Sequence, residues 1–132
     1  VICKYGVMWP PVYYYETFAN VIAPLTGMDD WADLAFVKRA GERISHLRRA
    51  YNHRLGITRE QETLPRRLLK EPMPTGPAKG GLPDLDVMLN EYYQYRGCDR
   101  ETGFPLESKL KDLDLDYVAE DLKKREMLAG QQ

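Results

Sequence analysis

The apolar positions at the start of the chain predict a loop followed by a helix. Residues 1–11 contain a Trp-Pro-Pro run, which excludes regular helix because proline fixes φ and donates no backbone hydrogen bond. We expect a loop or a short strand there. Residues 12–24 are rich in apolar and aromatic side chains, and four of them fall at helical spacing: Tyr14, Phe18, Val21 and Ile22. This spacing predicts a buried helix that ends near Pro24 and Gly27.

The clearest periodic pattern predicts one long helix over residues 30–55. Asp29 or Asp30 can cap its start, and Asp33 suits the positive end of the helix dipole. Gly56 is a natural stop just past its last turn. Apolar residues recur on one face and predict a buried stripe made of Leu34, Val37, Ile44, Leu47, Tyr51 and Leu55.

A glycine interrupts the apolar stripe of this long helix. Gly41 lies in mid-helix, where glycine costs about 1 kcal/mol relative to alanine. We therefore expect a close neighbour at Gly41, such as the backbone of another helix. The adjacent Glu42 and Arg43 are expected to form a structural ion pair.

The middle of the chain predicts irregular structure. Residues 57–83 contain LPRR and EPMPTGPAKGGLP, a run dense in proline and glycine. A loop of this length in a compact domain is usually functional or draped over a partner, and the alternative is a flexible linker. Anchoring is favoured because the segment carries three leucines: Leu64, Leu68 and Leu69.

Short helices are predicted over residues 84–132. Asp84 or Asp86 can cap a helix over 86–96, Gly97 ends it, and a turn follows at 99–104. A further helix is expected from Pro105 to about Leu113, and a last one over about 116–128, before a frayed tail. Their apolar positions are Leu106, Leu110, Leu113, Val118, Leu122 and Leu128. No stretch alternates as a half-buried strand does, so we predict an all-α fold. It would be a single irregular helical domain over 1–132 with a long Pro/Gly-rich loop in the middle.

Composition narrows the class of protein. The chain has 132 residues, of which 43% are hydrophobic and 30% charged, with a formal net charge of −1. No apolar run approaches the roughly 20 residues that span a bilayer, and the start lacks the order of a signal peptide. No basic stripe is dense enough for nucleic acid. We expect a soluble, cytoplasmic protein with no nucleic-acid or membrane partner.

The cysteines and histidines form no metal motif by themselves. There are two cysteines, Cys3 and Cys98, no CxxC, and two histidines, His46 and His53. A disulfide between the cysteines stays open. A lone cysteine so close to Val1 is either an inert small apolar residue or a ligand whose partners lie in a longer chain. In the second case Val1 is not the natural start, and this sequence is the C-terminal fragment of a larger protein.

Two blocks of the chain resemble the C-terminal region of the tungsten-containing aldehyde ferredoxin oxidoreductase family. The family's tails run Gly-Glu-Arg-Ile, Arg-x-(Phe/Tyr)-Asn, Leu-Pro-x-Arg, Gly-Pro-x-x-Gly, Met-Leu-x-x-Tyr-Tyr-x-x-Arg-Gly-Trp-Asp and Thr-Gly-x-Pro. The matching positions here are Gly41–Ile44, Arg49–Asn52, Leu64–Arg67, Gly76–Gly80, Met88–Asp99 and Thr102–Pro105. The resemblance covers about residues 27–117. One departure is Cys98, which stands where the family usually has tryptophan and is expected to be a free thiol.

The resemblance implies an oxidoreductase built around a metal–pterin cofactor. The full-length enzyme would carry a tungsten-bis-pterin of the molybdopterin type and one 4Fe-4S cluster, with ferredoxin as electron acceptor and an aldehyde as substrate. VICKYG looks like the end of the family's Asp-x-x-Gly-Leu-Cys motif, so Cys3 is implied as the fourth cluster ligand, in a cofactor-proximal loop at 1–11. The family's catalytic acid–base residues lie upstream, so none is assigned to this chain. The fragment alone is expected to bind no cofactor and to be inactive.

Several alternatives stay open at this point. The parent enzyme could instead reduce carboxylates or an aromatic-ring thioester, or the chain could be a non-catalytic helical interaction module. His46 or His53 could be a general base, although an imidazole satisfied by a neighbour is favoured. Tyr13–Tyr15 could line a substrate channel or simply be core. Three basic residues could face an acidic electron carrier or form only a solvated basic face: Arg66, Arg67 and Lys79.

Overall fold

The computed structural model describes residues 15–129 of the chain. Cys3, the loop predicted at 1–11 and the first residues of the helix predicted at 12–24 lie outside the described residues. The chain divides into two compact units, the first ending at Ser45 and the second beginning at His46. Each unit is described by itself.

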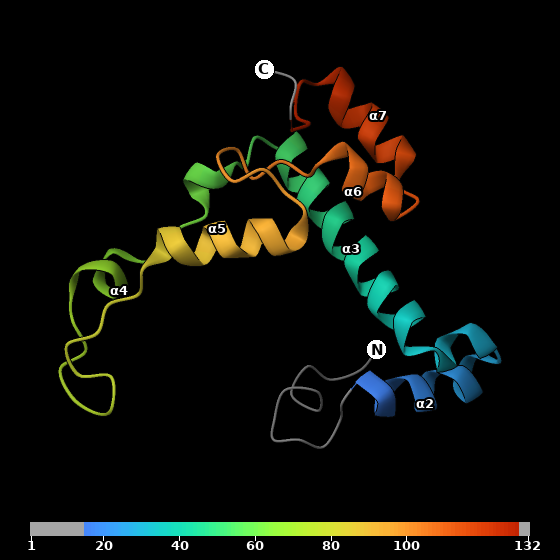
Figure 1. Ribbon diagram of the computed structural model, residues 1–132, viewed down its shortest axis with the longest axis horizontal. Helices are drawn as coiled ribbons and strands as arrows, with labels where there is room; N and C mark the ends of the chain where they lie inside the picture. The colour runs from blue at the N-terminus through green and yellow to red at the C-terminus, as the bar shows by residue number, and fades with distance from the viewer. Residues whose placement is uncertain (1–14, 130–132) are drawn as a thin grey trace. The chain divides into compact units, whose positions relative to one another are not determined.

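The described residues form an all-α structure, as predicted. The α-helices are α2 (Tyr15–Thr26), α3 (Leu34–Arg54), α4 (Arg66–Lys70), α5 (Leu85–Arg96), α6 (Glu107–Asp112) and α7 (Asp116–Lys124), and two 3-10 turns are η1 (Asp29–Ala32) and η2 (Arg59–Gln61) (Figure 1). Residues 15–129 contain no strand, only one bridge that pairs Cys98 with Pro105. None of the described helices combines the length and apolarity needed to cross a bilayer.

The first unit departs from its predicted helices in two ways. In α2 the small Ala19 and Ala23 are buried, whereas Val21, expected in the core, is exposed. The helix expected from residue 30 is broken at Asp33, whose backbone is extended and whose Oδ1 accepts the Ala35 N–H at 2.8 Å. An aspartate that offers its side chain to the next backbone donors ends one element and starts another. α3 therefore begins four residues later than expected.

The apolar stripe predicted for α3 is largely on the surface of the described chain. Four of its members are exposed: Ile44, Leu47, Tyr51 and Leu55. The buried positions of the second unit's part of α3 are instead His46, Ala50 and His53. The apolar face that the periodicity predicted is present on α3. The buried side chains of α3 in the second unit, however, lie on the neighbouring face of the helix. Around Gly41 no atom lies within 4 Å of the place of a Cβ, so its expected close neighbour is not among the described contacts.

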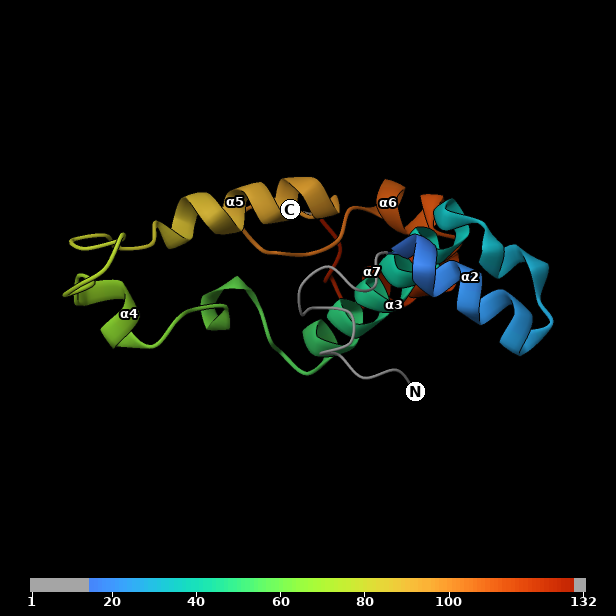
Figure 2. The same ribbon diagram turned by 90° about the horizontal axis from the view of Figure 1, so that it is seen from below.

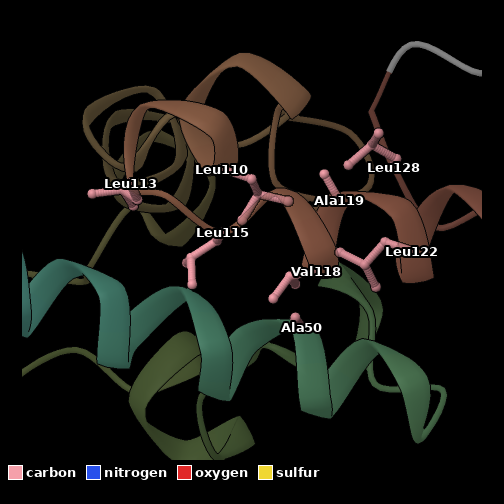
Figure 3. Packing of buried hydrophobic residues seen from close by; sticks show 8 residues of the cluster. All are labelled: Ala50, Leu110, Leu113, Leu115, Val118, Ala119, Leu122 and Leu128. Atoms are coloured by element: carbon pink, nitrogen blue, oxygen red, sulfur yellow. The ribbon is translucent and has the colours of Figure 1, made fainter.

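The core of the second unit is built by α6, α7 and one alanine of α3. Figure 3 shows this cluster above Ala50 of α3: Leu110 comes from α6, Val118, Ala119 and Leu122 come from α7, and Leu113, Leu115 and Leu128 come from the segments that follow these two helices. The predicted core positions Leu110, Leu113 and Leu122 are fully buried, and full burial of a leucine contributes about 1.5–3 kcal/mol. Leu106, by contrast, is exposed. α7 ends at Lys124, four residues before the predicted end, and the chain turns back through Glu126 at φ +57°.

The middle segment is irregular but contains two short helical pieces that its composition did not reveal. Both η2 and α4 fall within residues 57–83. Beyond α4 the chain closes a loop on itself, since the Met73 N–H donates to Gly81 O at 3.2 Å and the Gly80 N–H to Met73 O at 2.9 Å. Figure 2 shows this loop joining α4 to α5.

Helix α5 forms as its end signals predicted. The Asp84 side chain accepts the Val87 N–H at 3.1 Å, and Gly97 closes the C-terminus at φ +64°. Of the residues on α5 only Tyr93 is fully buried. Its ring points into the polar cluster described next, so α5 contributes one anchor rather than an apolar face.

Candidate functional site

A hydrogen-bonded polar cluster joins four segments of the second unit. Its members are Arg49 and His53 of α3, Glu62 after η2, Tyr93 of α5 and the carbonyl of Gly103. Arg49 and His53 are four residues apart and therefore share one side of the helix. Both reach the same acceptor, Gly103 O, at 3.0 Å.

The turn that presents Gly103 is fixed by Asp99. Oδ1 of Asp99 accepts the Thr102 hydroxyl at 2.7 Å and the Thr102 N–H at 2.8 Å. These bonds stabilise the charged carboxylate, and the Thr102 hydroxyl contributes most to lowering the pKa of Asp99. Gly103 has φ +74°, and a Cβ there would lie 3.1 Å from Arg49 Nη1 and 3.3 Å from the Tyr93 hydroxyl. Only glycine suits both the backbone and the space.

Arg49 and Glu62 form the charged centre of the cluster. Nη2 of Arg49 lies 2.7 Å from Glu62 Oε1, while the Tyr93 hydroxyl donates to the second carboxylate oxygen. Burial and the Glu62 carboxylate raise the pKa of Tyr93 to about 12, so the phenol stays protonated at neutral pH. The guanidiniums of Arg49 and Arg59 lie 5.1 and 5.2 Å from the Tyr93 ring centre, within cation–π range.

Both histidines are buried and held by backbone carbonyls. His53 Nδ1 lies 2.7 Å from Ile57 O and Nε2 lies 3.0 Å from Gly103 O, and its ring meets Phe104 edge-on. His46 Nε2 lies 2.9 Å from Arg96 O. Burial lowers the pKa of His53, although its carbonyl contacts oppose this by favouring the proton. A neutral imidazole donates to only one of the two carbonyls. Both rings contact backbone carbonyls, as the favoured interpretation expects, but in a neutral His53 one ring nitrogen faces a carbonyl without a hydrogen bond.

Cys98 is a buried free thiol, as predicted. Burial raises its pKa, so the thiolate that metals prefer is disfavoured there. Its backbone N–H donates to Tyr93 O at 2.8 Å, which fixes the exit of the chain from α5.

The described residues do not by themselves fit a metal or cluster site. Within residues 15–129 no group of three or more His, Cys, Asp or Glu side chains is placed to hold a metal ion. A cubane cluster needs four thiolates, and Cys98 is the one cysteine in this range. Cys3, the implied ligand, and the Tyr13–Tyr15 cluster lie outside the side chains that the structure describes.

An open hollow lies beside the polar cluster, with a volume of about 430 Å³. Its polar wall is the Arg49–Glu62 pair, and its apolar wall comes from leucines and Tyr92: Leu64, Leu85 and Leu89. Both oxygens of Glu62 accept hydrogen bonds from side chains of the cluster, one from Arg49 and one from Tyr93. The polar cluster holds α3, α5 and the Gly103 turn in place relative to one another, and we assign no acid–base chemistry to it.

The remaining sequence predictions have mixed outcomes. Arg67 lies 3.4 Å from Glu71 in an exposed ion pair, and Arg66 and Lys79 are exposed too, as a solvated basic face requires. The predicted pairing of Glu42 with Arg43 stays a prediction. The polar cluster itself was not predicted, because its contacts join residues 13 to 54 positions apart in the chain. Its one local signal is the Arg49–His53 spacing on a helix.

Comparison with known proteins identifies the family. A sequence model described as "aldehyde ferredoxin oxidoreductase, domains 2 & 3" matches residues 1–115. The chain belongs to this family. The tungsten-containing aldehyde ferredoxin oxidoreductase of Pyrococcus abyssi is 44% identical over 79 residues, which are 59% of this chain and 13% of that protein. The enzyme of the same name from Thermococcus kodakarensis is 43% identical over 70 residues, 52% of this chain and 12% of the relative.

A solved structure shares the fold over nearly the whole chain. The BamBC active-site complex of benzoyl coenzyme A reductase, solved with 1,5-dienoyl-CoA, aligns with a TM-score of 0.73 at 29% identity, over 92% of this chain and 17% of the other. Among the tungsten-containing sequence relatives, the match likewise covers only about an eighth of the length of the relative. The relatives of this chain in the aldehyde ferredoxin oxidoreductase family are oxidoreductases, so the chain is a domain of an enzyme family.

Three of the segments that carry the resemblance described above meet in the polar cluster. Arg49 opens the Arg-x-(Phe/Tyr)-Asn motif, Tyr93 lies in the Met-Leu-x-x-Tyr-Tyr motif, and Gly103 belongs to Thr-Gly-x-Pro. These three motifs are far apart in the sequence and meet in one hydrogen-bonded cluster. The motifs therefore hold one another in place.

Proposed function

We propose that this chain is the helical C-terminal part of a tungstopterin, iron–sulfur aldehyde:ferredoxin oxidoreductase-like enzyme. The family match over residues 1–115 carries the proposal, and the 44% identity to a tungsten-containing relative supports it. The reaction is oxidation of an aldehyde with water to a carboxylic acid, with two electrons passed to ferredoxin. When bound, the metal–pterin and the 4Fe-4S cluster supply the redox chemistry.

The role of this chain in that enzyme is to support and close the cofactor region. The polar cluster around Arg49 ties α3, α5 and the Gly103 turn together with charge-assisted hydrogen bonds, which are stronger than neutral ones. A rigid support of this kind keeps cofactor-binding groups in position and bulk water out. The cytoplasm is the proposed location, and the free thiol of Cys98 suits a reducing compartment.

Cys3 is the residue that we propose as a direct cofactor contact, as the fourth thiolate of the cluster. The support is the VICKYG motif, which lies inside the matched region. The test is Cys3→Ala in the native full chain, with Cys98→Ser as the matched control, because Cys98 is buried and has a raised pKa. Electron paramagnetic resonance of the reduced protein should lose or alter the cluster signal in the first variant alone. An unchanged spectrum for Cys3→Ala rejects the assignment.

A second candidate is a superfamily relative that reduces an aromatic-ring thioester. It is favoured by the fold shared with the benzoyl coenzyme A reductase complex over 92% of the chain. Anaerobic assays of the native protein separate the two functions. Aldehyde-dependent ferredoxin reduction supports the first, and ring reduction of an aromatic thioester supports the second. A chain of this length that binds no metal would leave only the non-catalytic helical module.

A further inference from the structure

The ring of His53 is enclosed between two backbone carbonyls. The residue is 2% exposed, with Nδ1 2.7 Å from Ile57 O and Nε2 3.0 Å from Gly103 O. A neutral imidazole has one N–H and can donate to only one of these carbonyls, whereas an imidazolium can donate to both. The hydrogen bonds at this place therefore depend on whether the ring carries one proton or two.

The two carbonyls are not equivalent acceptors. Gly103 O already accepts a hydrogen bond from Arg49 Nη1 at 3.0 Å, and the contact of His53 with Ile57 O is the shorter of its two. We therefore assign the single proton of the neutral ring to Nδ1, which donates it to Ile57 O. In that tautomer the Nε2 lone pair faces Gly103 O, and Nε2 is the atom at which a second proton would bind.

A proton on Nε2 would bring a second positive charge to Gly103 O. The Arg49 guanidinium and the His53 imidazolium would then both donate to this one oxygen. Like charges repel each other more strongly in a buried site than in water. The carboxylate that faces them is Glu62, and its two oxygens already accept hydrogen bonds from Arg49 and Tyr93. The added charge would therefore weaken the cluster.

The other titratable and charged groups around the cluster do not offset this charge. Tyr93 of α5 has a pKa of about 12 and stays neutral, and burial raises the pKa of the Cys98 thiol, which stays neutral too. The Asp99 carboxylate accepts its hydrogen bonds from Thr102, within its own turn. Arg59 adds positive charge, with its guanidinium 5.2 Å from the Tyr93 ring centre.

The pKa of His53 agrees in direction with this geometry. Burial has the largest influence and lowers it, and the Arg49 charge lowers it as well, against the two carbonyls and Glu62. We propose that His53 is an acid-sensitive switch of the Gly103 turn, in which proton binding at Nε2 weakens the bond from Arg49 to Gly103 O and favours an open turn. This device uses only residues of the polar cluster and is independent of the proposed function.

The size of the effect follows from proton linkage. In an open turn the pKa of His53 returns toward its ordinary value of about 6.5, and in the closed turn it is lower. Closure is therefore most favourable above about pH 6.5 and is lost as the pH falls toward the closed-turn value. Between pH 7.5 and 5.5 a single histidine can weaken closure by at most about tenfold.

Hydrogen exchange of the unmodified native full chain tests the switch without any substitution. Protection factors, corrected for the intrinsic effect of pH on exchange, are measured at pH 7.5 and 5.5. The reporters are Gly103 N–H, bonded to Asp99 O, and Asp99 N–H, bonded to Phe104 O. Their protection should fall by about three- to tenfold at the lower pH. The Ala119 N–H of α7, bonded to Leu115 O, should keep its protection. Constant or increased protection of the turn overturns the proposal, and so does an equal fall at Ala119.

Two histidine variants of the full chain then assign the proton. His53→Gln cannot take up a proton at this place and should remove the fall in turn protection between pH 7.5 and 5.5. His46→Gln is the matched control, because His46 is also 2% exposed and its Nε2 lies 2.9 Å from Arg96 O. It should keep the fall seen in the wild type. A His53→Gln protein with the full wild-type fall overturns the assignment to His53. If His53→Gln does not fold, the pH dependence of the unmodified chain decides.

Discussion

Replacing Gly103 by alanine should loosen the polar cluster far more than a typical glycine substitution does. Two costs can be separated. Alanine at φ +74° is strained by roughly 1–2 kcal/mol. The new Cβ would also lie 3.1 Å from Arg49 Nη1 and 3.3 Å from the Tyr93 hydroxyl, so these neighbours must shift. When the Arg49 guanidinium shifts, Gly103 O loses the hydrogen bond that Arg49 Nη1 donates to it. A hydrogen bond from a charged donor contributes about 1.5–3 kcal/mol to stability. The expected total is about 3–5 kcal/mol.

Gly76→Ala is the matched control for this substitution. Gly76 has φ +83°, and no atom lies within 4 Å of its would-be Cβ. It therefore carries the backbone strain without the crowding, and we expect a cost of roughly 1–2 kcal/mol confined to its own loop. The difference between the two variants isolates the contribution of the close contacts with Arg49 and Tyr93.

Hydrogen exchange read by mass spectrometry suits this comparison, because it measures local opening within a larger protein. The reporters are amides of the turn, such as Asp99 N–H bonded to Phe104 O and Gly103 N–H bonded to Asp99 O. Their protection should fall by about a hundredfold or more in Gly103→Ala, since 1.4 kcal/mol is a factor of ten. Gly76→Ala should leave the turn unchanged. Equal protection of the turn in both variants would refute the claim that the polar cluster holds this turn in place.

Two further predictions concern titratable groups of the same unit. The pKa of His53 is lowered by burial, so the unfolded chain binds its proton more readily; stability should be full above about pH 6.5 and fall as the pH drops toward the folded pKa. His53→Gln keeps one donor and should flatten the pH dependence of turn protection between pH 7.5 and 5.5, whereas a slope equal to wild type would contradict this. The buried Cys98 thiol, with its raised pKa, should react with iodoacetamide at pH 7.5 at least about tenfold more slowly in the native protein than after unfolding. Equal rates would show that the thiol is accessible.

The elements with strong local signals were predicted from the sequence. Helix α5 has the aspartate cap and the glycine stop that its sequence indicated, at Asp84 and Gly97. The leucines of α6 and α7 that recur at helical spacing are the core, as expected of Leu110 and Leu122. Each of these features depends on residues that are only a few positions apart in the chain. Such local spacings can be read from the sequence without knowing how distant segments pack.

The long-range arrangement could not be predicted in this way. The stripe containing Leu47 and Tyr51 has the period of a buried helix face, but periodicity does not say which element covers it. The cluster joining Arg49, Glu62 and Tyr93 depends on how three separate segments pack. A short-range pattern cannot contain that information. Cys3 was identified by resemblance to a family motif, and its role as a ligand stays a prediction.

The central claim is that this chain is part of a tungsten- and iron–sulfur-containing oxidoreductase. The most direct test is elemental analysis of the native full chain, purified without oxygen, for tungsten, molybdenum and iron. The account predicts tungsten together with about four irons per polypeptide, the complement of one cubane cluster. A native protein that contains neither tungsten nor iron would contradict it.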